Sequence, residues 1–193
     1  MDKVFNVIVE GPTRVGKGTL IRKLMELPRF HGAFTHHFGF PPDEGTPHDK
    51  MFYQRGSFDT AMQWMVGLNG SGIKVLLDRC WVGERIFGPM YRGYHPDPRL
   101  RRMEEELIPR MAPTFMVRLR CSYSDVVARH AESGDARPLI SEDAWDRLNA
   151  DYEEAYSAGY MCRDSILDLN SGIMTPPQLA SSVTRFLSLI LDK

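Results

Sequence analysis

The chain has 193 residues, with 24 lysines and arginines against 25 aspartates and glutamates, which leaves a formal net charge of −1 at pH 7. This balance argues against a protein that coats a polyanion or a membrane surface, so we expect neither a nucleic acid polymer nor a membrane as partner. No apolar run approaches the roughly 18 residues of a spanning helix. The length suits one domain over residues 1–193.

The cysteines and the first residues bear on location. Cys80, Cys121 and Cys162 are far apart and odd in number, as is usual for free thiols in a reducing compartment. The N-terminal segment MDKVFNVIVEG lacks a small-residue cleavage site and reads as a strand rather than a signal peptide. We therefore expect a cytoplasmic protein. The adjacent His36 and His37 would point to opposite faces of a strand, which argues against a shared metal ion.

A short apolar run rich in β-branched residues and bounded by Gly11 predicts the first strand, and four later segments also look like strands. They cover residues 4–10, 33–40, 73–78, 114–121 and 165–170. Helical patterns separate them at 19–27, 48–68, 98–111, 122 to about 132, 142–157 and from 175 onward, with a further helical start in 83–92. This alternation predicts an α/β fold, a five-stranded parallel sheet with helices on both faces and right-handed crossovers.

The segment GPTRVGKGT, residues 11–19, lies between the first strand and the first helix and fits the pattern G-x-x-x-x-G-K. Such a loop points its backbone N–H groups at phosphates, and Lys17 would reach the β- and γ-phosphates. The predicted donor-site residues are Gly11, Pro12, Thr13, Arg14, Val15, Gly16, Lys17, Gly18 and Thr19. Gly18 stands where a serine or threonine usually meets magnesium, so Thr19 is the candidate for a water-mediated contact with Mg²⁺.

A second signature follows the third predicted strand, which ends in Asp78-Arg79 and continues as the run DRCWVGERIFGPMYRG. An acidic residue at the carboxyl end of a parallel strand lies where such sheets bind ligands. Asp78 could hold a magnesium-bound water or take a proton, and Arg79 could clamp a second anion. The alternative is that Asp78 caps the next turn and Arg79 pairs with it.

Together, GPTRVGKGT, FPPDE, DRCWVGERIFGPMYRG and a late loop with arginines resemble thymidylate-kinase-like P-loop kinases, above all the deoxynucleoside monophosphate kinases of bacteriophages. The resemblance extends over roughly residues 4–169. It implies ATP as donor, Mg²⁺, and transfer of the γ-phosphoryl group to a nucleotide, in the host cytoplasm if the chain is phage-encoded. In one class of these kinases an arginine at the place of Arg14 contacts the transferring group, but the acidic residue that precedes it there is Thr13 here. Family members often pair through helices, so a homodimer is a further expectation.

The same resemblance places a mobile lid at residues 128–141, with Arg129 and Arg137 as the cations that would act over the phosphates. A solvated polar loop is the alternative for this segment. The predicted catalytic residues are Arg14, Lys17, Asp78 and Arg79, and Arg129 is also expected to contact the donor.

The acceptor pocket is expected between FPPDE, the long helix and residues 81–92. The candidate acceptor contacts are Phe38, Pro41, Arg55, Arg79, Glu84, Tyr91, Arg92 and Arg137. The aromatic rings, together with those of Phe40 and Trp81, could stack on a base. Arg55 is the preferred pocket cation, and the identity of the base stays open.

Two acceptor classes remain open. A monophosphate arrives ionised and needs cations, whereas a nucleoside hydroxyl needs a carboxylate base. The monophosphate is favoured by the arginines at positions 14, 79, 92, 129 and 137. Asp43, Glu44 or Glu84 could supply a base, so a deoxynucleoside kinase is the alternative. A P-loop switch without a second substrate and a kinase for bases in polymeric DNA are less favoured, because the chain has a full acceptor segment and no basic stripe.

Overall fold

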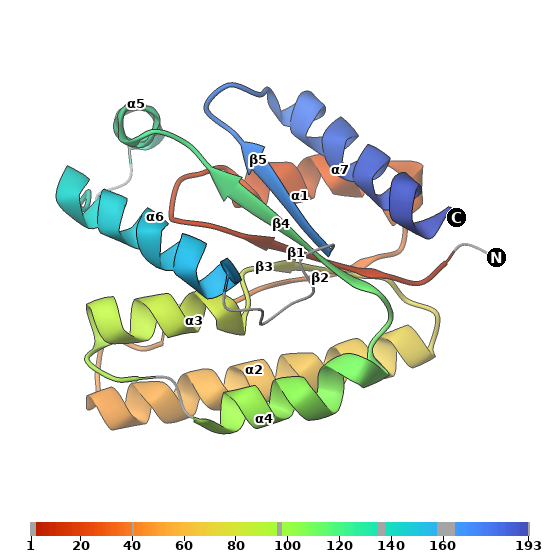
Figure 1. The fold of residues 1–193 in the computed structure, drawn as a ribbon, viewed down its shortest axis with the longest axis horizontal. Coiled ribbons are helices and arrows are strands. Elements are labelled where there is room, and N and C mark those ends of the chain that lie inside the picture. The colour runs from red at the N-terminus through yellow and green to blue at the C-terminus, as the bar shows by residue number, and fades with distance from the viewer. Residues whose placement is uncertain (1–2, 40, 96–97, 135–137, 158–164, 193) are drawn as a thin grey trace. The chain divides into compact units, whose positions relative to one another are not determined.

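The computed structural model describes residues 3–39, 41–95, 98–134, 138–157 and 165–192 (Figure 1). Its five strands form one parallel sheet in the order β2-β3-β1-β4-β5. The strands are β1 Asn6–Glu10, β2 Phe34–His37, β3 Val75–Asp78, β4 Thr114–Arg120 and β5 Ile166–Asn170. The predicted α/β fold with a five-stranded parallel sheet is confirmed.

Helical structure follows every strand. The helices are α1 Lys17–Met25, α2 Pro47–Gly70, α3 Trp81–Phe87, α4 Pro98–Leu107, α5 Tyr123–Ser133, α6 Glu142–Ser157 and α7 Pro176–Leu191. Two short 3-10 turns, η1 Pro28–Phe30 and η3 Ile108–Arg110, and a π-helical turn, η2 Gly88–Arg92, also occur. Within the described ranges, no helix combines the length and the apolar character that crossing a membrane requires.

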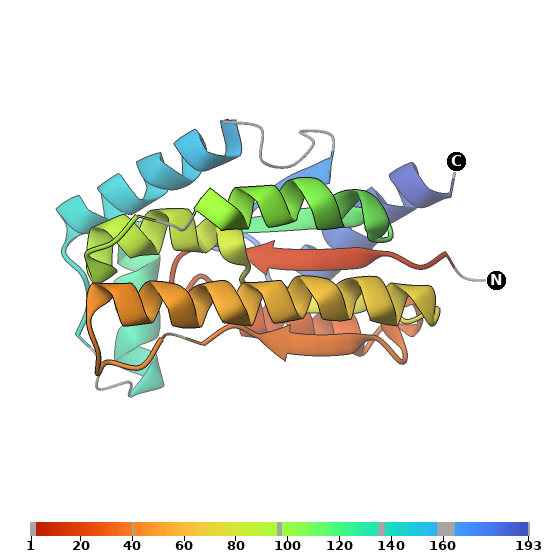
Figure 2. The ribbon, with the colours of Figure 1, turned by 90° about the horizontal axis from the view of Figure 1, so that it is seen from below.

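The chain divides into two compact units, to both of which β1 contributes. Unit 1 comprises Met1–Ile8 and Gly32–Phe115, and unit 2 comprises Val9–His31 and Met116–Lys193. In unit 1, β2 pairs with β3, and the long helix α2 lies beside α4 (Figure 2). Large side chains that are fully buried form the core of this unit, among them Phe5, Met62, Met65, Leu76, Leu77 and Trp81.

In unit 2, β4 pairs with β5 from Met116 opposite Ile166 to Arg120 opposite Asn170. Helices α1 and α7 pack side by side, as Figure 1 shows. Their facing apolar stripes supply Leu20, Leu24, Val183 and Leu187, all completely buried. These stripes have the spacing of one helical face, and their burial explains why the two segments are helical.

The start of α5 has a capping box. The hydroxyl of Ser122 accepts the N–H of Asp125 at 3.1 Å, and the Asp125 carboxylate accepts the N–H of Ser122 at 3.0 Å. Such a reciprocal pair satisfies two backbone donors that a helix start leaves without partners. The predicted strand at 33–40 is too long, since β2 ends at His37. Prolines at 41 and 42 lack the N–H groups that a longer ladder would need.

Candidate active site

The glycine-rich loop of unit 2 connects β1 to α1, as predicted. Gly11 has φ 140° and Gly16 has φ 94°, conformations that favour glycine. A Cβ atom on Gly11 would lie only 2.3 Å from the carbonyl oxygen of Leu119 on β4. Any larger residue at position 11 would therefore displace the loop from the sheet.

Lys17, the first residue of α1, is buried inside this loop. Its Nζ donates to the carbonyl oxygens of Gly11 at 3.0 Å and Pro12 at 2.7 Å. The first N–H groups of any helix have no acceptor within that helix, and here they share one end of α1 with a fixed ammonium group. This arrangement can bind the phosphates of a nucleotide.

Arg14 lies in the middle of the loop with φ 67°, a left-handed conformation that is uncommon for residues other than glycine. Such a conformation costs on the order of 1–3 kcal/mol and is concentrated at functional sites. Its carbonyl oxygen accepts a hydrogen bond from Nη1 of Arg129 at 3.1 Å. The main chain at Arg14 is therefore held in place from α5.

Arg129 lies on α5 and is anchored to the protein. Its Nη1 also donates to the hydroxyl of Ser171 at 3.1 Å, and its Nη2 donates to the carbonyl oxygen of Ser171 at 2.6 Å. The guanidinium thus joins the phosphate loop to the segment after β5. Within the predicted lid, residues 128–133 belong to α5, and Arg137 lies outside the described residues.

The remaining predicted loop residues differ in exposure. Val15 is completely buried and Pro12 is buried, whereas Gly18 is exposed at the start of α1. Thr13 and Thr19 are half-buried, and the Thr19 hydroxyl accepts from Nη2 of Arg22 at 3.3 Å. All nine predicted donor-site residues therefore lie on this loop and the first turn of α1.

In unit 1, β3 ends at Asp78, as predicted. Oδ2 of Asp78 lies 3.1 Å from Nδ1 of His37 at the end of β2, while its buried Oδ1 has no hydrogen-bond partner among the described residues. A buried carboxylate oxygen without a donor is unfavourable unless a water, an ion or a substrate supplies one. The geometry therefore fits the predicted role of Asp78 toward a magnesium-bound water or a proton.

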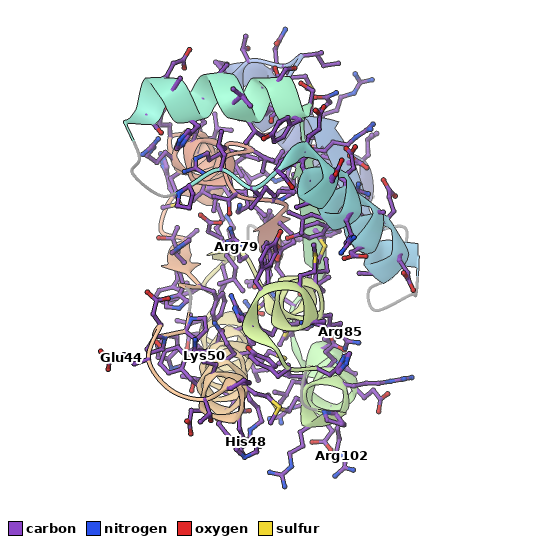
Figure 3. The ribbon with its side chains drawn as sticks, turned by 90° about the vertical axis from the view of Figure 1, so that its left-hand side faces the viewer. Glu44, His48, Lys50, Arg79, Arg85 and Arg102 are labelled. Atoms are coloured by element: carbon purple, nitrogen blue, oxygen red, sulfur yellow. The ribbon has the colours of Figure 1, made fainter. Side chains whose placement is uncertain are left out.

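Arg79 follows with φ 75°. Among the described residues, it and Arg14 are the only ones other than glycine with positive φ. Its guanidinium carbon lies 5.1 Å from the centre of the Phe87 ring, within the range of a cation–π contact. Figure 3 labels Arg79 near the start of α3. The strained backbone and the aromatic support together orient one cation at the carboxyl end of β3.

Glu84 and Arg92, both predicted to contact the acceptor, bind each other in this structure. Glu84 is buried, and its two carboxylate oxygens accept from Arg92 and from the hydroxyl of Tyr94. Burial, followed by the hydrogen bond to Glu84, raises the pKa of Tyr94 well above its usual value, so the phenol stays protonated. This ion pair joins α3, which carries Glu84, to the turn η2, which ends at Arg92.

A groove lies between β2 and α2 and has a volume of about 480 Å³. It is lined by His36, His37, Phe38, Gly39, Tyr53, Gly56, Ser57, Thr60 and Trp64. We call it the β2–α2 groove. The rings of His36 and Trp64 meet edge to face at 5.8 Å. Burial, followed by the charge of His37, lowers the pKa of His36, which favours the neutral ring. Aromatic rings beside hydroxyl groups suit a flat, polar-edged ligand.

The other predicted acceptor residues are placed as follows. Phe38 lines the β2–α2 groove, but the guanidinium of Arg55 lies over the Phe52 ring at 4.4 Å. Pro41 is buried, and Tyr91 is exposed with its ring 5.7 Å from that of Phe87. Trp81 is completely buried in the core, so it cannot stack on a ligand. Phe40 lies outside the described residues.

Comparison with known proteins gives the fold. No protein-family model and no curated protein matches the chain. YorR from Bacillus subtilis, solved in complex with phosphorylated GDP, has a TM-score of 0.70 at 15% identity over 97% of this chain and 98% of that one. The thymidylate kinase of Candida albicans has a TM-score of 0.64 at 12% identity over 97% and 92%. The deoxyadenosine kinase of M. mycoides with bound dATP has a TM-score of 0.59 at 16% identity, over 93% of this chain and 97% of that one.

The chain has the fold of P-loop nucleotide kinases.

The sequence analysis did not predict the side of α2 that lines the β2–α2 groove. Tyr53, Ser57, Thr60 and Trp64 recur at the spacing of one helical face, which is visible in the sequence. A second set of large residues on α2, such as Phe58, is buried on another face and blurs the pattern. Tyr94 was also missed, because nothing in its local sequence indicates a buried carboxylate partner.

Proposed function

We propose that this protein transfers the γ-phosphoryl group of ATP to a deoxynucleoside monophosphate, thymidylate or a related or base-modified nucleotide, and releases the diphosphate. A non-bridging oxygen of the acceptor phosphate attacks the γ-phosphorus. The bond from that phosphorus to the β–γ bridging oxygen breaks, and ADP leaves with this oxygen. No proton has to be removed, because the acceptor phosphate is already ionised.

The donor side of the proposal rests on the phosphate loop. Lys17, the amide groups at the start of α1 and the fixed loop glycines provide positive potential for a triphosphate. Arg14 would compensate charge on the transferring group, since catalysis of this reaction depends mainly on positioning and electrostatic stabilisation.

One observation carries the choice of a monophosphate acceptor: the buried carboxylate of Glu84 already accepts from Arg92 and Tyr94. A carboxylate with both oxygens engaged by strong donors is a poor base for a nucleoside hydroxyl. Arg79, oriented over Phe87, instead provides a cation for an anionic acceptor. The β2–α2 groove would receive the base.

A second candidate function, phosphorylation of a nucleoside 5′-hydroxyl, is favoured by Asp78. Its Oδ1 has no hydrogen-bond partner in the described part of the chain and could accept the hydroxyl proton. The same atom would serve the preferred reaction differently, by holding a water of Mg²⁺. Thr19 is the other residue proposed to contact such a water, and the ion would neutralise charge on the donor phosphates.

The experiment is an acceptor panel with coupled detection of ADP. ATP and Mg²⁺ are supplied with each of the four common deoxynucleoside monophosphates, dUMP, base-modified pyrimidine monophosphates and the matching nucleosides. Turnover is expected only with monophosphates. Turnover only with nucleosides would replace the proposed function by the second candidate, and ADP release independent of any acceptor would contradict both.

A further inference from the structure

A buried carboxylate lies at the base of the phosphate loop. Glu10 is the last residue of β1 and has 0% of its surface exposed. Its Oε1 accepts the N–H of Gly11 at 3.1 Å and the hydroxyl of Tyr152 at 3.0 Å. All three residues belong to unit 2.

Tyr152 reaches Glu10 from α6. Among the described side chains of this helix, Trp145, Leu148 and Tyr152 are buried, at the spacing of one helical face. Tyr152 is also 0% exposed, and a buried tyrosine hydroxyl requires a hydrogen-bond partner. The carboxylate of Glu10 provides it, so α6 is joined to the start of the phosphate loop.

The peptide groups of Gly11 are held on both sides. Glu10 accepts from its N–H, Lys17 donates to its carbonyl oxygen, and the backbone of Leu119 blocks movement toward β4. The orientation of this residue therefore determines where the loop amides and the ammonium group of Lys17 lie. A change at Glu10 would be transmitted to the phosphate-binding groups through Gly11.

Electrostatics alone would disfavour a carboxylate here. A negative charge beside an anion-binding loop opposes the binding of phosphates, and burying a charge costs free energy unless hydrogen bonds compensate it. Glu10 is nevertheless completely buried. Two of the donors that compensate its charge are the N–H of Gly11 and the hydroxyl of Tyr152. A role in geometry explains its presence better than a role in charge.

We propose that Glu10 and Tyr152 are positioning residues of the phosphate loop, which hold the Gly11 peptide so that the loop is preorganised for donor phosphates. The inference rests on the proposed function only in taking this loop as the ATP site. Neither residue needs to touch the nucleotide. Because the net contribution of a single hydrogen bond is modest, loss of one link should weaken phosphate binding about three- to tenfold.

The test uses the full chain with Mg²⁺ and two probes, ATP and inorganic tripolyphosphate, with dissociation constants from titration calorimetry. Tyr152→Phe removes only the hydroxyl, and we expect both probes to bind about three- to tenfold more weakly, by the same factor. The matched control is Tyr123→Phe. Its hydroxyl donates to the carbonyl oxygen of Ile140 at 2.9 Å, away from Glu10, so affinity should stay unchanged.

Variants of Glu10 complete the test. Glu10→Gln keeps an acceptor oxygen and removes the charge, so it should bind tripolyphosphate at least as tightly as the wild type. Glu10→Ala should weaken binding about tenfold, the result expected for loss of both contacts. In the Glu10→Ala background, Tyr152→Phe should have no further effect on affinity, since the two residues act through one contact.

The outcomes separate the two proposals. Unchanged affinities in Tyr152→Phe and Glu10→Ala, with only their melting temperatures lowered, would show a merely structural role and overturn the inference. So would equal losses from Tyr152→Phe in both backgrounds. A wild-type chain that binds neither probe would overturn the proposed function itself and the inference with it.

Discussion

The phosphate loop of unit 2 and the proposed acceptor side of unit 1, here α3, η2 and α4, are built on different principles. In the loop, main-chain groups predominate: glycine conformations, helix-end amides and carbonyl oxygens that receive Lys17. On the acceptor side, charged side chains pair with one another, as Glu84 does with Arg92 and Arg85 with Glu104. Main-chain recognition suits a donor common to many kinases, whereas paired side chains can change to suit an acceptor.

The largest predicted effect tests whether the acceptor-side pair is structural. Glu84→Gln should lower the free energy of unfolding by about 3–5 kcal/mol, because a neutral amide replaces the buried carboxylate that accepts from Arg92 and Tyr94. Urea denaturation measures the loss. Glu105→Gln is the control: its exposed pair with Arg101 should contribute less than about 0.5 kcal/mol. Similar effects of both substitutions would refute a structural role for Glu84.

Unlike Glu84, Lys17 of the phosphate loop is a charged side chain whose loss should affect turnover rather than stability. Lys17→Met should lower the rate of phosphoryl transfer about a hundredfold or more while the circular dichroism spectrum stays the same. Lys23→Met on the same helix removes an exposed partner of Glu26 and should leave turnover unchanged. Unaltered turnover in Lys17→Met would remove the loop from the mechanism.

The second acceptor-side pair predicts a dependence of stability on pH. Burial raises the pKa of Glu104 to about 7, although Arg85, 2.6 Å away, opposes this (Figure 3 labels Arg85 between α3 and α4). Between pH 4.5, the ordinary pKa of a glutamate, and about pH 7, the folded state therefore keeps a proton on Glu104 that the unfolded state has released. The free energy of unfolding should therefore fall, by up to about 3 kcal/mol, as pH rises from about 5 to about 8.

Urea midpoints across this pH range test the prediction for Glu104. Glu104→Gln cannot ionise, so it should lack the decline and match the wild type near pH 5, where Glu104 is protonated. Parallel curves for the two proteins would show that another group causes the pH dependence.

The smallest predicted effect concerns the two arginines with positive φ, one in each unit. Arg14→Gly and Arg79→Gly relieve backbone strain, and this gain offsets the entropy cost of glycine. The free energy of unfolding should therefore rise by between zero and about 1 kcal/mol in each variant. Turnover should fall in both, and in Arg14→Gly more than ATP affinity does. Arg22→Gly within α1 should destabilise by about 1 kcal/mol. If all three substitutions destabilised the protein equally, Arg14 and Arg79 would not be under backbone strain.

The contrast between main-chain groups in the phosphate loop and paired side chains in unit 1 also explains what could be predicted from the sequence. Gly11, Gly16 and Lys17 were identified because phosphate binding by a loop requires particular residues at fixed spacing between a strand and a helix. The sheet followed from the alternation of apolar strands and helices. The partners of Arg92 and the burial of Trp81 could not be predicted, because they depend on packing between segments distant in the sequence.

Transfer of label from γ-³²P-ATP to thymidylate, compared with thymidine, tests the central proposal most directly. The proposed function predicts radioactive thymidine diphosphate, formed by the wild type and lost in Lys17→Met, with no label in thymidine. Label that appears only in the monophosphate formed from thymidine would contradict a deoxynucleoside monophosphate kinase, and label that appears only in inorganic phosphate would contradict thymidylate as the acceptor.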